Sequence, residues 1–495
     1  MACTTRAWLV GVIPLVVACG DDVTDADDAA GSTGATGSGV TGASAVATTA
    51  PPPTSTSAGT EDDATADGES DASAGTDGDT GATTGAASFA DPRGYTLISP
   101  LNSRFTYLFD ADGMEINHWE ASTTPANIAY LLPNGHLLRV SRDPKPVVEL
   151  VSGAGGAVQE FDWDGNLVWE YDYVAPDIVA HHDIEPMPNG HVLIVAYEMH
   201  DFDEAVAMGA DPSELSADGR WADHVVEVDP ATDQIVWEWH VWDHLVQDFD
   251  PLAANYGDVA SSQGRIDLNW DRPGVSPRPD WTHTNAIDYR ESLDQIVLSP
   301  RTFSEIWIID HSTTTAEAAT SAGGNAGHGG DLLYRFGNPQ ASQAGDALDR
   351  QLYFQHHPHW LDDDRILIFD NGDDELRPWS RVVEIETPLL GDGNYELTGP
   401  FYGPAMPTWS YESPEDFYAA FISGADRISD GHTLVTDGPA GRLFEIDPAG
   451  NVAWEYRLET PVFRAERHEA DDPAFEGLSE QDLAPKGPLV IDLSP

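Results

Sequence analysis

The sequence contains almost no cysteine. Cys3 and Cys19 are the only two cysteines among 495 residues. A mature protein that begins at Cys19 would therefore contain no disulfide and carry out no thiol chemistry. A chain of this length can bury a core large enough to be stable without disulfides.

Positive charge is also scarce. Lys and Arg together number 23 against 85 Asp and Glu, which gives a formal net charge of -62, and Lys145 and Lys486 are the only lysines. Nucleic acids are bound through clustered cations that neutralise phosphates, so this composition excludes a nucleic-acid partner. We interpret the excess acid as a solubility adaptation, for example to a saline medium, rather than as an acidic recognition surface.

The apolar run near the start is too short to span a bilayer. Arg6 precedes an uncharged run over residues 7–18, whereas a membrane span needs about 20 apolar residues. This pattern predicts a signal peptide over residues 1–18. The run ends at Val16-Val17-Ala18-Cys19, which resembles a bacterial lipoprotein cleavage site and makes Cys19 the predicted lipidation site. Plain cleavage with Cys19 incidental is the alternative.

A segment without large apolar residues follows. Residues 20–90 consist mainly of Thr, Gly, Ala, Ser and Asp, and no Lys or Arg lies between Arg6 and Arg93. Such a composition cannot bury enough surface to offset its conformational entropy. We therefore expect residues 19–90 to be a lipidated, disordered tether. The protein would be exported and anchored to the cell envelope, on the periplasmic side or the outer surface.

The remainder, residues 91–495, repeats a two-part unit. Its first half is an apolar strand, a tight turn and a second apolar strand, at residues 128–140, 184–196, 360–369 and 427–436. Turns such as Pro133-Asn134-Gly135 and Pro188-Asn189-Gly190 supply the positive φ that two-residue hairpins require. The second half ends in an aromatic strand, at Trp169-Glu170-Tyr171, Trp237-Glu238-Trp239 and Trp454-Glu455-Tyr456.

Four short strands per unit with recurring aromatic residues are typical of propeller blades. The units number about six, so the predicted fold is all-β: a six-bladed β-propeller preceded by a disordered N-terminal tether. A β-sandwich is the less favoured alternative. We expect residues 487–493 to supply the strand that closes the ring, and the insertion at residues 241–280 to lie near the channel mouth.

Histidines recur at the start of the innermost strand in three consecutive predicted blades. They are the pair His181-His182, then His283, then the pair His356-His357. Because inner strands line the axis of a propeller, we expect these side chains to face one axial site. Imidazoles gathered there can bind a metal, or they can perform nucleophilic and acid–base chemistry on an anionic group.

A cation favours the second use. Arg301 ends the strand that forms a hairpin with the strand after His283, so it can reach the same axial site. Its planar guanidinium suits a sulfate or phosphate group. We assign no metal ligand and expect no cofactor.

The motifs around these residues resemble one family. The matching pieces, in order over about residues 95–460, are His181-His182-Asp183-Ile184, Pro188-Asn189-Gly190-His191, Trp242-Asp243-His244-Leu245, Asp280-Trp281-Thr282-His283-Thr284-Asn285, Arg301, Gln355-His356, Phe369-Asp370-Asn371-Gly372 and Ser380-Arg381-Val382-Val383-Glu384. Together they resemble the PAPS-independent aryl-sulfate sulfotransferase family, whose fold is a six-bladed propeller.

The resemblance implies roles for individual residues. It places the sulfated nucleophile at His356, further active-site histidines at His283 and His182, and the active-site arginine at Arg301. The doubled histidines leave His357 open as the nucleophile and His181 as the partner. We expect His181, His357 and Asn285 to contact substrate.

The implied reaction is a ping-pong transfer of a sulfuryl group from a phenolic sulfate ester to a phenolic acceptor, through a sulfo-histidine. Two alternatives remain. One is a non-catalytic, lipid-anchored binding module, and the other is a metal-dependent hydrolase or lyase that uses the axial histidines.

Overall fold

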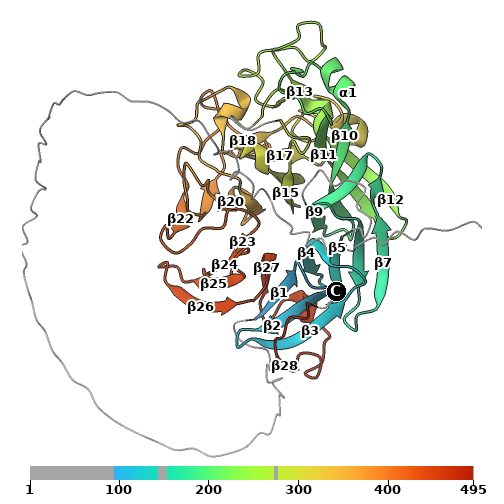
Figure 1. Ribbon diagram of the computed structural model, residues 1–495, viewed down its shortest axis with the longest axis vertical. Coiled ribbons are helices and arrows are strands. Elements are labelled where there is room, and N and C mark those ends of the chain that lie inside the picture. The colour runs from blue at the N-terminus through green and yellow to red at the C-terminus, as the bar shows by residue number, and fades with distance from the viewer. Residues whose placement is uncertain (1–93, 143–152, 272–276, 494–495) are drawn as a thin grey trace, which may run out of the picture. The chain divides into compact units, whose positions relative to one another are not determined.

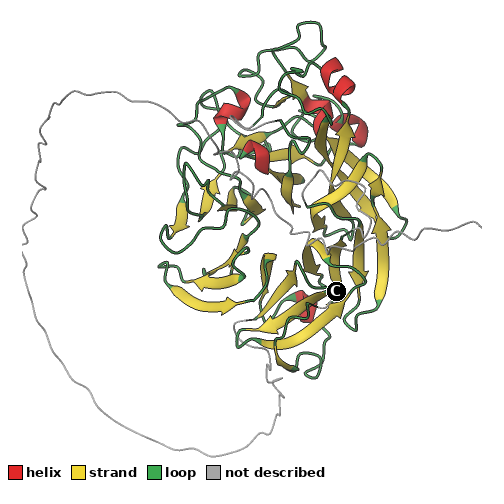
Figure 2. Ribbon diagram, viewed as in Figure 1, coloured by secondary structure: helices red, strands yellow, loops and turns green. Residues whose placement is uncertain are grey.

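The computed structural model describes residues 94–142, 153–271 and 277–493. The predicted signal peptide, Cys19 and the predicted tether lie outside the described residues. Within these ranges the protein is almost entirely strand and loop, with a few short helices (Figure 2). No helix among the described residues is long and apolar enough to cross a membrane.

The described strands form six antiparallel sheets of four or five strands, and one short parallel pair. Blade 1 contains β27 (Val462–His468), β1 (Tyr95–Pro100), β2 (Phe105–Asp110), β3 (Met114–Glu120) and β28 (Gly487–Pro488). Blade 2 contains β4 (Pro125–Leu131), β5 (Leu137–Ser141), β6 (Ala157–Phe161) and β7 (Leu167–Asp172). Blade 3 contains β8 (Val174–Ala175), β9 (Ile178–Pro186), β10 (Val192–His200), β11 (Arg220–Asp229) and β12 (Gln234–His240).

The other three blades have four strands each. Blade 4 contains β15 (Thr284–Arg290), β16 (Gln295–Pro300), β17 (Ile306–Asp310) and β18 (Tyr334–Phe336). Blade 5 contains β19 (His356–Trp360), β20 (Arg365–Asp370), β21 (Arg381–Glu386) and β22 (Trp409–Glu412). Blade 6 contains β23 (Gly424–Arg427), β24 (Thr433–Asp437), β25 (Arg442–Ile446) and β26 (Val452–Arg457).

Short elements occupy the connections. The parallel pair is β13 (Leu245–Val246) with β14 (Ile266–Asp267). The helices are α1 (Phe202–Ala207), α2 (Thr315–Ala318), and the 3-10 turns η1 (Val241–His244), η2 (Arg301–Phe303), η3 (Pro339–Ser342) and η4 (Pro473–Phe475).

A separate apolar cluster joins each pair of neighbouring blades. Leu193 of blade 3, for example, packs in one cluster with Leu298 of blade 4, and Ile368 of blade 5 packs in another with Ile308 of blade 4. Among the described residues, six such clusters join the blades in the order 1 to 6 and then 6 to 1. The six-bladed propeller is therefore confirmed, and Figure 1 shows blades 6 and 1 meeting where β27 lies beside β1.

The predicted turns are confirmed where the hairpins form. Gly135 between β4 and β5 has φ 79°, and Gly190 between β9 and β10 has φ 86°. Both values lie in the left-handed region that glycine adopts without a steric penalty. The repeat is also visible in side chains. In three blades, the histidine just before one strand bonds a glutamate of the next strand: His136 to Glu160, His191 to Glu227 and His432 to Glu445, at 2.6 to 2.7 Å.

The ring closes through a different strand from the one predicted. β27 is the innermost strand of blade 1 and pairs with β1, Tyr95 lying opposite His468. Residues 487–493, which we expected to close the ring, contribute only the short strand Gly487–Pro488, and this strand pairs with β3 at the outer side of blade 1. The prediction was wrong because β27 is rich in charged residues and lacks the pattern of a buried strand, and its charges are paired only within the folded ring.

The insertion at residues 241–280 packs on blades 3 and 4. Its buried side chains Val241, Leu245, Ile266 and Leu268 belong to the apolar cluster that joins these two blades. Trp242 stacks on His200 with ring centroids 3.7 Å apart. The insertion is thus part of the hydrophobic core as well as a loop between blades.

Candidate active site

The inner strands that carry the predicted histidines are all irregular. Pairing shifts register between Ile194 and Ala196 opposite β9, within β15 near Thr284, and within β19 after His356. Such bulges insert a residue and turn side chains to a new direction, and they recur beside active sites.

Left-handed backbone accompanies these bulges. His182, His283 and His357 have φ values of 52°, 54° and 49°. A non-glycine residue in this region costs about 1–2 kcal/mol, and such strained residues cluster at functional sites. The fold maintains this conformation at three inner strands, which directs histidine side chains from three blades.

The structure links three of the predicted histidines through ring contacts, two of them with Phe463 of β27. The rings of His182 and His283 have centroids 4.6 Å apart, and the Phe463 ring lies 6.1 Å from His182 and 6.0 Å from His356. All three histidines are buried. Blades 3, 4, 5 and 1 therefore each contribute a ring to one axial site.

The pKa of His182 reflects its burial among these side chains. Burial lowers the pKa of His182 well below its usual range, and the neighbouring charges of His283, His181, His356 and Arg301 lower it further. At pH 7 the imidazole of His182 is therefore neutral.

One hydrogen bond determines the tautomer of His356. Its Nδ1 lies 2.7 Å from Oδ1 of Asn371. The Asn371 amide cannot be turned round, because its Nδ2 donates to the carbonyl oxygens of Ala419 at 2.8 Å and Ile422 at 2.9 Å. Since Oδ1 can only accept, Nδ1 of His356 carries the proton and donates, which leaves the lone pair on Nε2.

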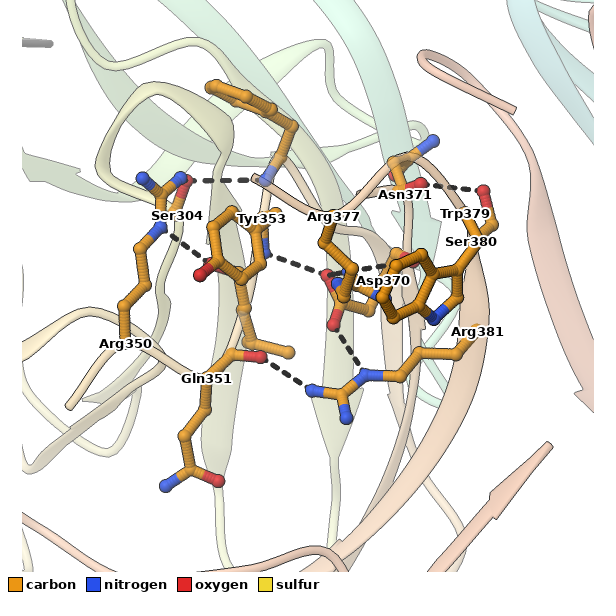
Figure 3. A network of polar contacts seen from close by, with 12 residues as sticks. Ser304, Arg350, Gln351, Tyr353, Asp370, Asn371, Arg377, Trp379, Ser380 and Arg381 are labelled. Carbon is orange, nitrogen blue, oxygen red and sulfur yellow. Dashed lines mark hydrogen bonds and ion pairs between the residues drawn. The ribbon is translucent and has the colours of Figure 1, made fainter. Parts of the chain in front are cut away.

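A polar network fixes the segment that leads into His356 (Figure 3). The Asp370 carboxylate forms ion pairs with Arg377 at 2.5 Å and Arg381 at 2.9 Å, and it accepts a hydrogen bond from the backbone N–H of Tyr353 at 2.7 Å. Asp370 is fully buried. Two arginines thus hold the end of β20 against the approach to β19, and Asn371 follows directly in the chain.

His283 forms a pair with a carboxylate. Its Nδ1 lies 2.7 Å from Oδ2 of Asp280. Burial raises the pKa of the Asp280 carboxyl, but the charge and hydrogen bond of His283 outweigh burial and leave that pKa below its usual value. The carboxylate is therefore ionised and orients the imidazole, so that its Nε2 can take up and release a proton.

The two members of the His181-His182 pair have different surroundings. His181 stacks on Tyr197 with centroids 3.5 Å apart, and its Nε2 lies 3.3 Å from Asp223. The two Nδ1 atoms of the pair are 2.8 Å apart. His182 approaches the other axial rings, whereas His181 lies behind it and supports it.

Arg301 lies beside His283, as its hairpin position predicts. Its backbone N–H donates to the carbonyl of His283 at 3.1 Å, and its guanidinium lies 4.9 Å from the centre of the Phe354 ring. Asn285 donates from Nδ2 to the carbonyl of Gln355 at 2.8 Å. Asn285 therefore holds the backbone next to His356.

His357 has neighbours of its own. Its ring stacks on His359 with centroids 4.5 Å apart. Burial, and next the charge of Arg464, lowers the pKa of His357 well below its usual range. Of the doubled pair, His356 is the histidine that packs with His182 around Phe463.

A buried ion pair lies beside the histidines. Arg464 of β27 donates to Oδ2 of Asp183 at 2.8 Å and also bonds the Tyr130 hydroxyl. Tyr130 in turn donates to the other oxygen of Asp183 at 2.7 Å. Blades 1, 2 and 3 are thereby tied together next to the site.

Several of these residues had no role predicted from the sequence. Asn371 and Asp280 lie within the motifs quoted above, but their function depends on contacts that only the fold creates. Phe463 and Arg464 belong to the unrecognised strand β27. The Asp-x-x-His spacing of residues 280–283 was the one local signal that could have predicted a partner for His283.

Comparison with protein families decides between the chemistries open to such a site. Residues 95–476 match the family model Arylsulfotransferase (ASST). The chain belongs to the arylsulfotransferase family. Membership of this family makes the protein a sulfotransferase enzyme acting on small molecules, and aryl sulfotransfer is its general activity.

Other comparisons add little. No curated protein matches the chain. Among solved structures, a protein of unknown function from Bacteroides caccae aligns at 11% identity and TM-score 0.42, covering 75% of this chain and 98% of its own. Virginiamycin B lyase from Staphylococcus aureus aligns at 10% identity and TM-score 0.37, covering 75% and 83%. Similarities at this level carry no argument about function.

Proposed function

We propose that this arylsulfotransferase works by a ping-pong mechanism in which Nε2 of His356 carries the sulfuryl group. The observation that supports this role is the Asn371 amide, whose orientation makes Nδ1 the protonated nitrogen and places the lone pair on Nε2. A neutral imidazole with a directed lone pair is a competent nucleophile toward sulfur.

In the first half-reaction, a phenolic sulfate ester binds with its sulfur near His356. The Nε2–S bond forms while the S–O bond to the aryl group breaks, and the phenolate leaves. His283 gives its proton to that oxygen, and the carboxylate of Asp280 stabilises the imidazolium before transfer. A loose transition state of this kind depends on positioning and charge stabilisation, and Arg301 binds the sulfuryl oxygens.

The second half-reaction reverses these roles. The acceptor phenol loses its proton to the now neutral His283, and its oxygen attacks sulfur as the N–S bond breaks. His182 has a pKa too low to act as the acid at pH 7, so we assign it to hydrogen bonding within the site. The chain's scarcity of cations favours a simple phenolic ester over a donor that carries additional phosphates, and no PAPS would be needed.

The intermediate provides the test. Wild-type protein mixed with an aryl sulfate, without acceptor, should gain the mass of one SO3 group on a peptide that contains His356. His356→Ala should abolish the label, whereas His357→Ala, the adjacent control, should keep it. A label that survives in His356→Ala would move the nucleophile elsewhere.

The same preparation distinguishes the alternative functions. Phenol-dependent release of the first phenol is expected from a sulfotransferase, and its absence would favour a binding module. Transfer that continues in the presence of a chelator, at a temperature where the fold is intact, would argue against a metal-dependent reaction at the axis.

We also propose that the enzyme is exported and lipid-anchored through Cys19. The support is the Val16-Val17-Ala18-Cys19 sequence after an apolar run, with a polar linker behind it. Radiolabelled palmitate should be incorporated into the wild type and not into Cys19→Ser. Equal labelling of both would refute the anchor.

A further inference from the structure

Three neighbouring strands of blade 3 bring metal-binding side chains onto one face. His224 of β11 lies opposite His240 of β12 and opposite Ala196 of β10. Glu198 and His200 follow Ala196 at alternate positions and therefore share its face. Glu198, His200, His224 and His240 are called the histidine–glutamate cluster below.

The cluster is compact. Glu198, His224 and His240 can each offer one ligand atom such that all three atoms lie within 4.8 Å of one another. Nδ1 of His240 is 2.9 Å from Oε2 of Glu198, and Nε2 of His200 is 3.4 Å from Oε1 of the same carboxylate. Four ligand atoms around a tetrahedral Zn²⁺ lie about 3.4 Å apart. The rings of His224 and His240 are stacked with centroids 5.0 Å apart, so one of these rings must rotate for both to bind the same ion.

His224 belongs to the cluster and has a buried ring nitrogen without a hydrogen-bond partner among the described residues. The residue is 1% exposed, and its Nδ1 has no hydrogen-bond partner among the residues that the structure describes. A buried nitrogen left in this state costs about 1–3 kcal/mol. Its other nitrogen, Nε2, lies 2.9 Å from the Tyr173 hydroxyl. If Nε2 carries the proton and donates to the Tyr173 oxygen, Nδ1 keeps its lone pair for a ligand.

The outer nitrogens of the other two histidines face carboxylates. Metal-bound histidines usually donate their second ring N–H to a carboxylate, carbonyl, hydroxyl or water. Here Nε2 of His240 is 3.7 Å from Glu238, and Nδ1 of His200 is 4.0 Å from Glu204. Both distances are longer than a hydrogen bond, so each pair must close slightly to act in this way. Trp242 stacks on His200 and limits its rotation.

We propose that the histidine–glutamate cluster binds a divalent transition-metal ion, for which Zn²⁺ is the best fit. Three imidazole nitrogens and one carboxylate oxygen match the ligands and coordination number of protein zinc. This proposal is independent of the reaction assigned to the axial histidines.

The position suggests a structural purpose. His200 lies directly before the excursion that begins with α1, and His240 lies directly before η1 and the 241–280 insertion. A metal ion here would hold the starts of both of these connecting segments against β11. On the same strand, the neighbour of His224, Asp223, accepts the backbone N–H of Thr284 at 2.7 Å and lies 3.3 Å from His181. The metal would thus stiffen the support behind the axial site.

Metal content tests the proposal directly. The purified mature protein is loaded with Zn²⁺, desalted and analysed by elemental mass spectrometry, with near-ultraviolet circular dichroism to verify folding. The wild type should retain about one Zn²⁺ per chain, as tight structural sites do. Glu198→Gln and His240→Gln should retain at least tenfold less. His191→Gln is the matched control, because His191 is 27% exposed against 29% for His240 and bonds a glutamate of the same blade.

If the variants do not fold, Co²⁺ bound to the wild-type protein tests the proposal instead. Co²⁺-loaded wild type should show the intense visible absorption of a four-coordinate nitrogen–oxygen site, and Zn²⁺ should displace it. The proposal is overturned if the folded wild type retains no Zn²⁺, if its Co²⁺ spectrum is that of a six-coordinate ion, or if His240→Gln folds and retains as much metal as His191→Gln.

Discussion

Asn371→Ala tests whether Asn371 fixes the tautomer of His356, because the substitution should lower the catalytic rate by more than its effect on stability explains. The substitution removes the acceptor for Nδ1–H of His356 and the donor to the carbonyls of Ala419 and Ile422. Each buried hydrogen bond contributes about 0.5–1.5 kcal/mol net, so three lost bonds predict a destabilisation of about 1.5–4.5 kcal/mol.

The catalytic loss should be larger than this local effect suggests. Without Asn371, His356 can place its proton on Nε2 and lose its nucleophilic lone pair, although the carbonyl of Phe354, 3.1 Å from Nδ1, still favours the productive tautomer. Wrong-tautomer substitutions at a histidine can lower kcat about 10⁴-fold. With partial compensation by Phe354, we expect a loss of about 10²–10³-fold in the rate of sulfo-enzyme formation.

The assay is stopped-flow release of the first phenol from a nitrophenyl sulfate, at a temperature where the variant is folded. Ser380→Ala is the control, because the Ser380 hydroxyl bonds the Asn371 backbone carbonyl at 2.6 Å and does not touch the histidine. It should lower stability while changing the burst rate far less than Asn371→Ala. A burst rate in Asn371→Ala equal to that of Ser380→Ala would refute the assignment of the tautomer to Asn371.

Two further predictions rest on ion pairs with histidine. Asp280→Asn should slow transfer from esters with poorly leaving phenols about 10²-fold or more, and much less with nitrophenol, because it weakens His283 as the acid; equal slowing across leaving groups would argue against that role. Although burial lowers the pKa of His311, its hydrogen bonds to Asp294 and Glu227 raise that pKa to about 9. The resulting stability is present below pH 6.5 and is lost as pH rises through 9. Its upper limit is about 3 kcal/mol. Urea unfolding of the wild type should therefore show a decline between pH 6.5 and 9.5 that is smaller in His311→Gln, in which the raised pKa values of His240 and His468 still contribute. An equal decline in both proteins would contradict the role of His311.

The blades were predictable because their signals are local. A turn such as Pro133-Asn134-Gly135 defines a hairpin by its own backbone preferences, and the structure gives Gly135 the expected positive φ. β27 was not predictable in the same way. Its residues Arg464, Glu466 and Arg467 are typical of a surface strand, and they become compatible with the interior only because partners such as Asp183 come from blades far away in sequence.

The site shows the same division between local and non-local information. The strand openings predicted which blades contribute histidines, since inner strands line the axis of any propeller. They did not predict which member of each doubled pair faces the other rings, because strict alternation along a strand assumes a regular ladder. The bulges in β9 and β19 break that alternation.

Those bulges are set by contacts across blades rather than by local preference. His182 keeps its left-handed backbone with its N–H bonded to the carbonyl of Gly153, in a loop of blade 2. A methyl group added to Gly153 would lie 2.2 Å from the His182 ring, so glycine is required there for the imidazole to reach its place. The orientation of the axial histidines is therefore a property of the closed ring. A doubled histidine in an isolated blade sequence cannot reveal which ring faces the axis, because the residues that select it belong to the neighbouring blade.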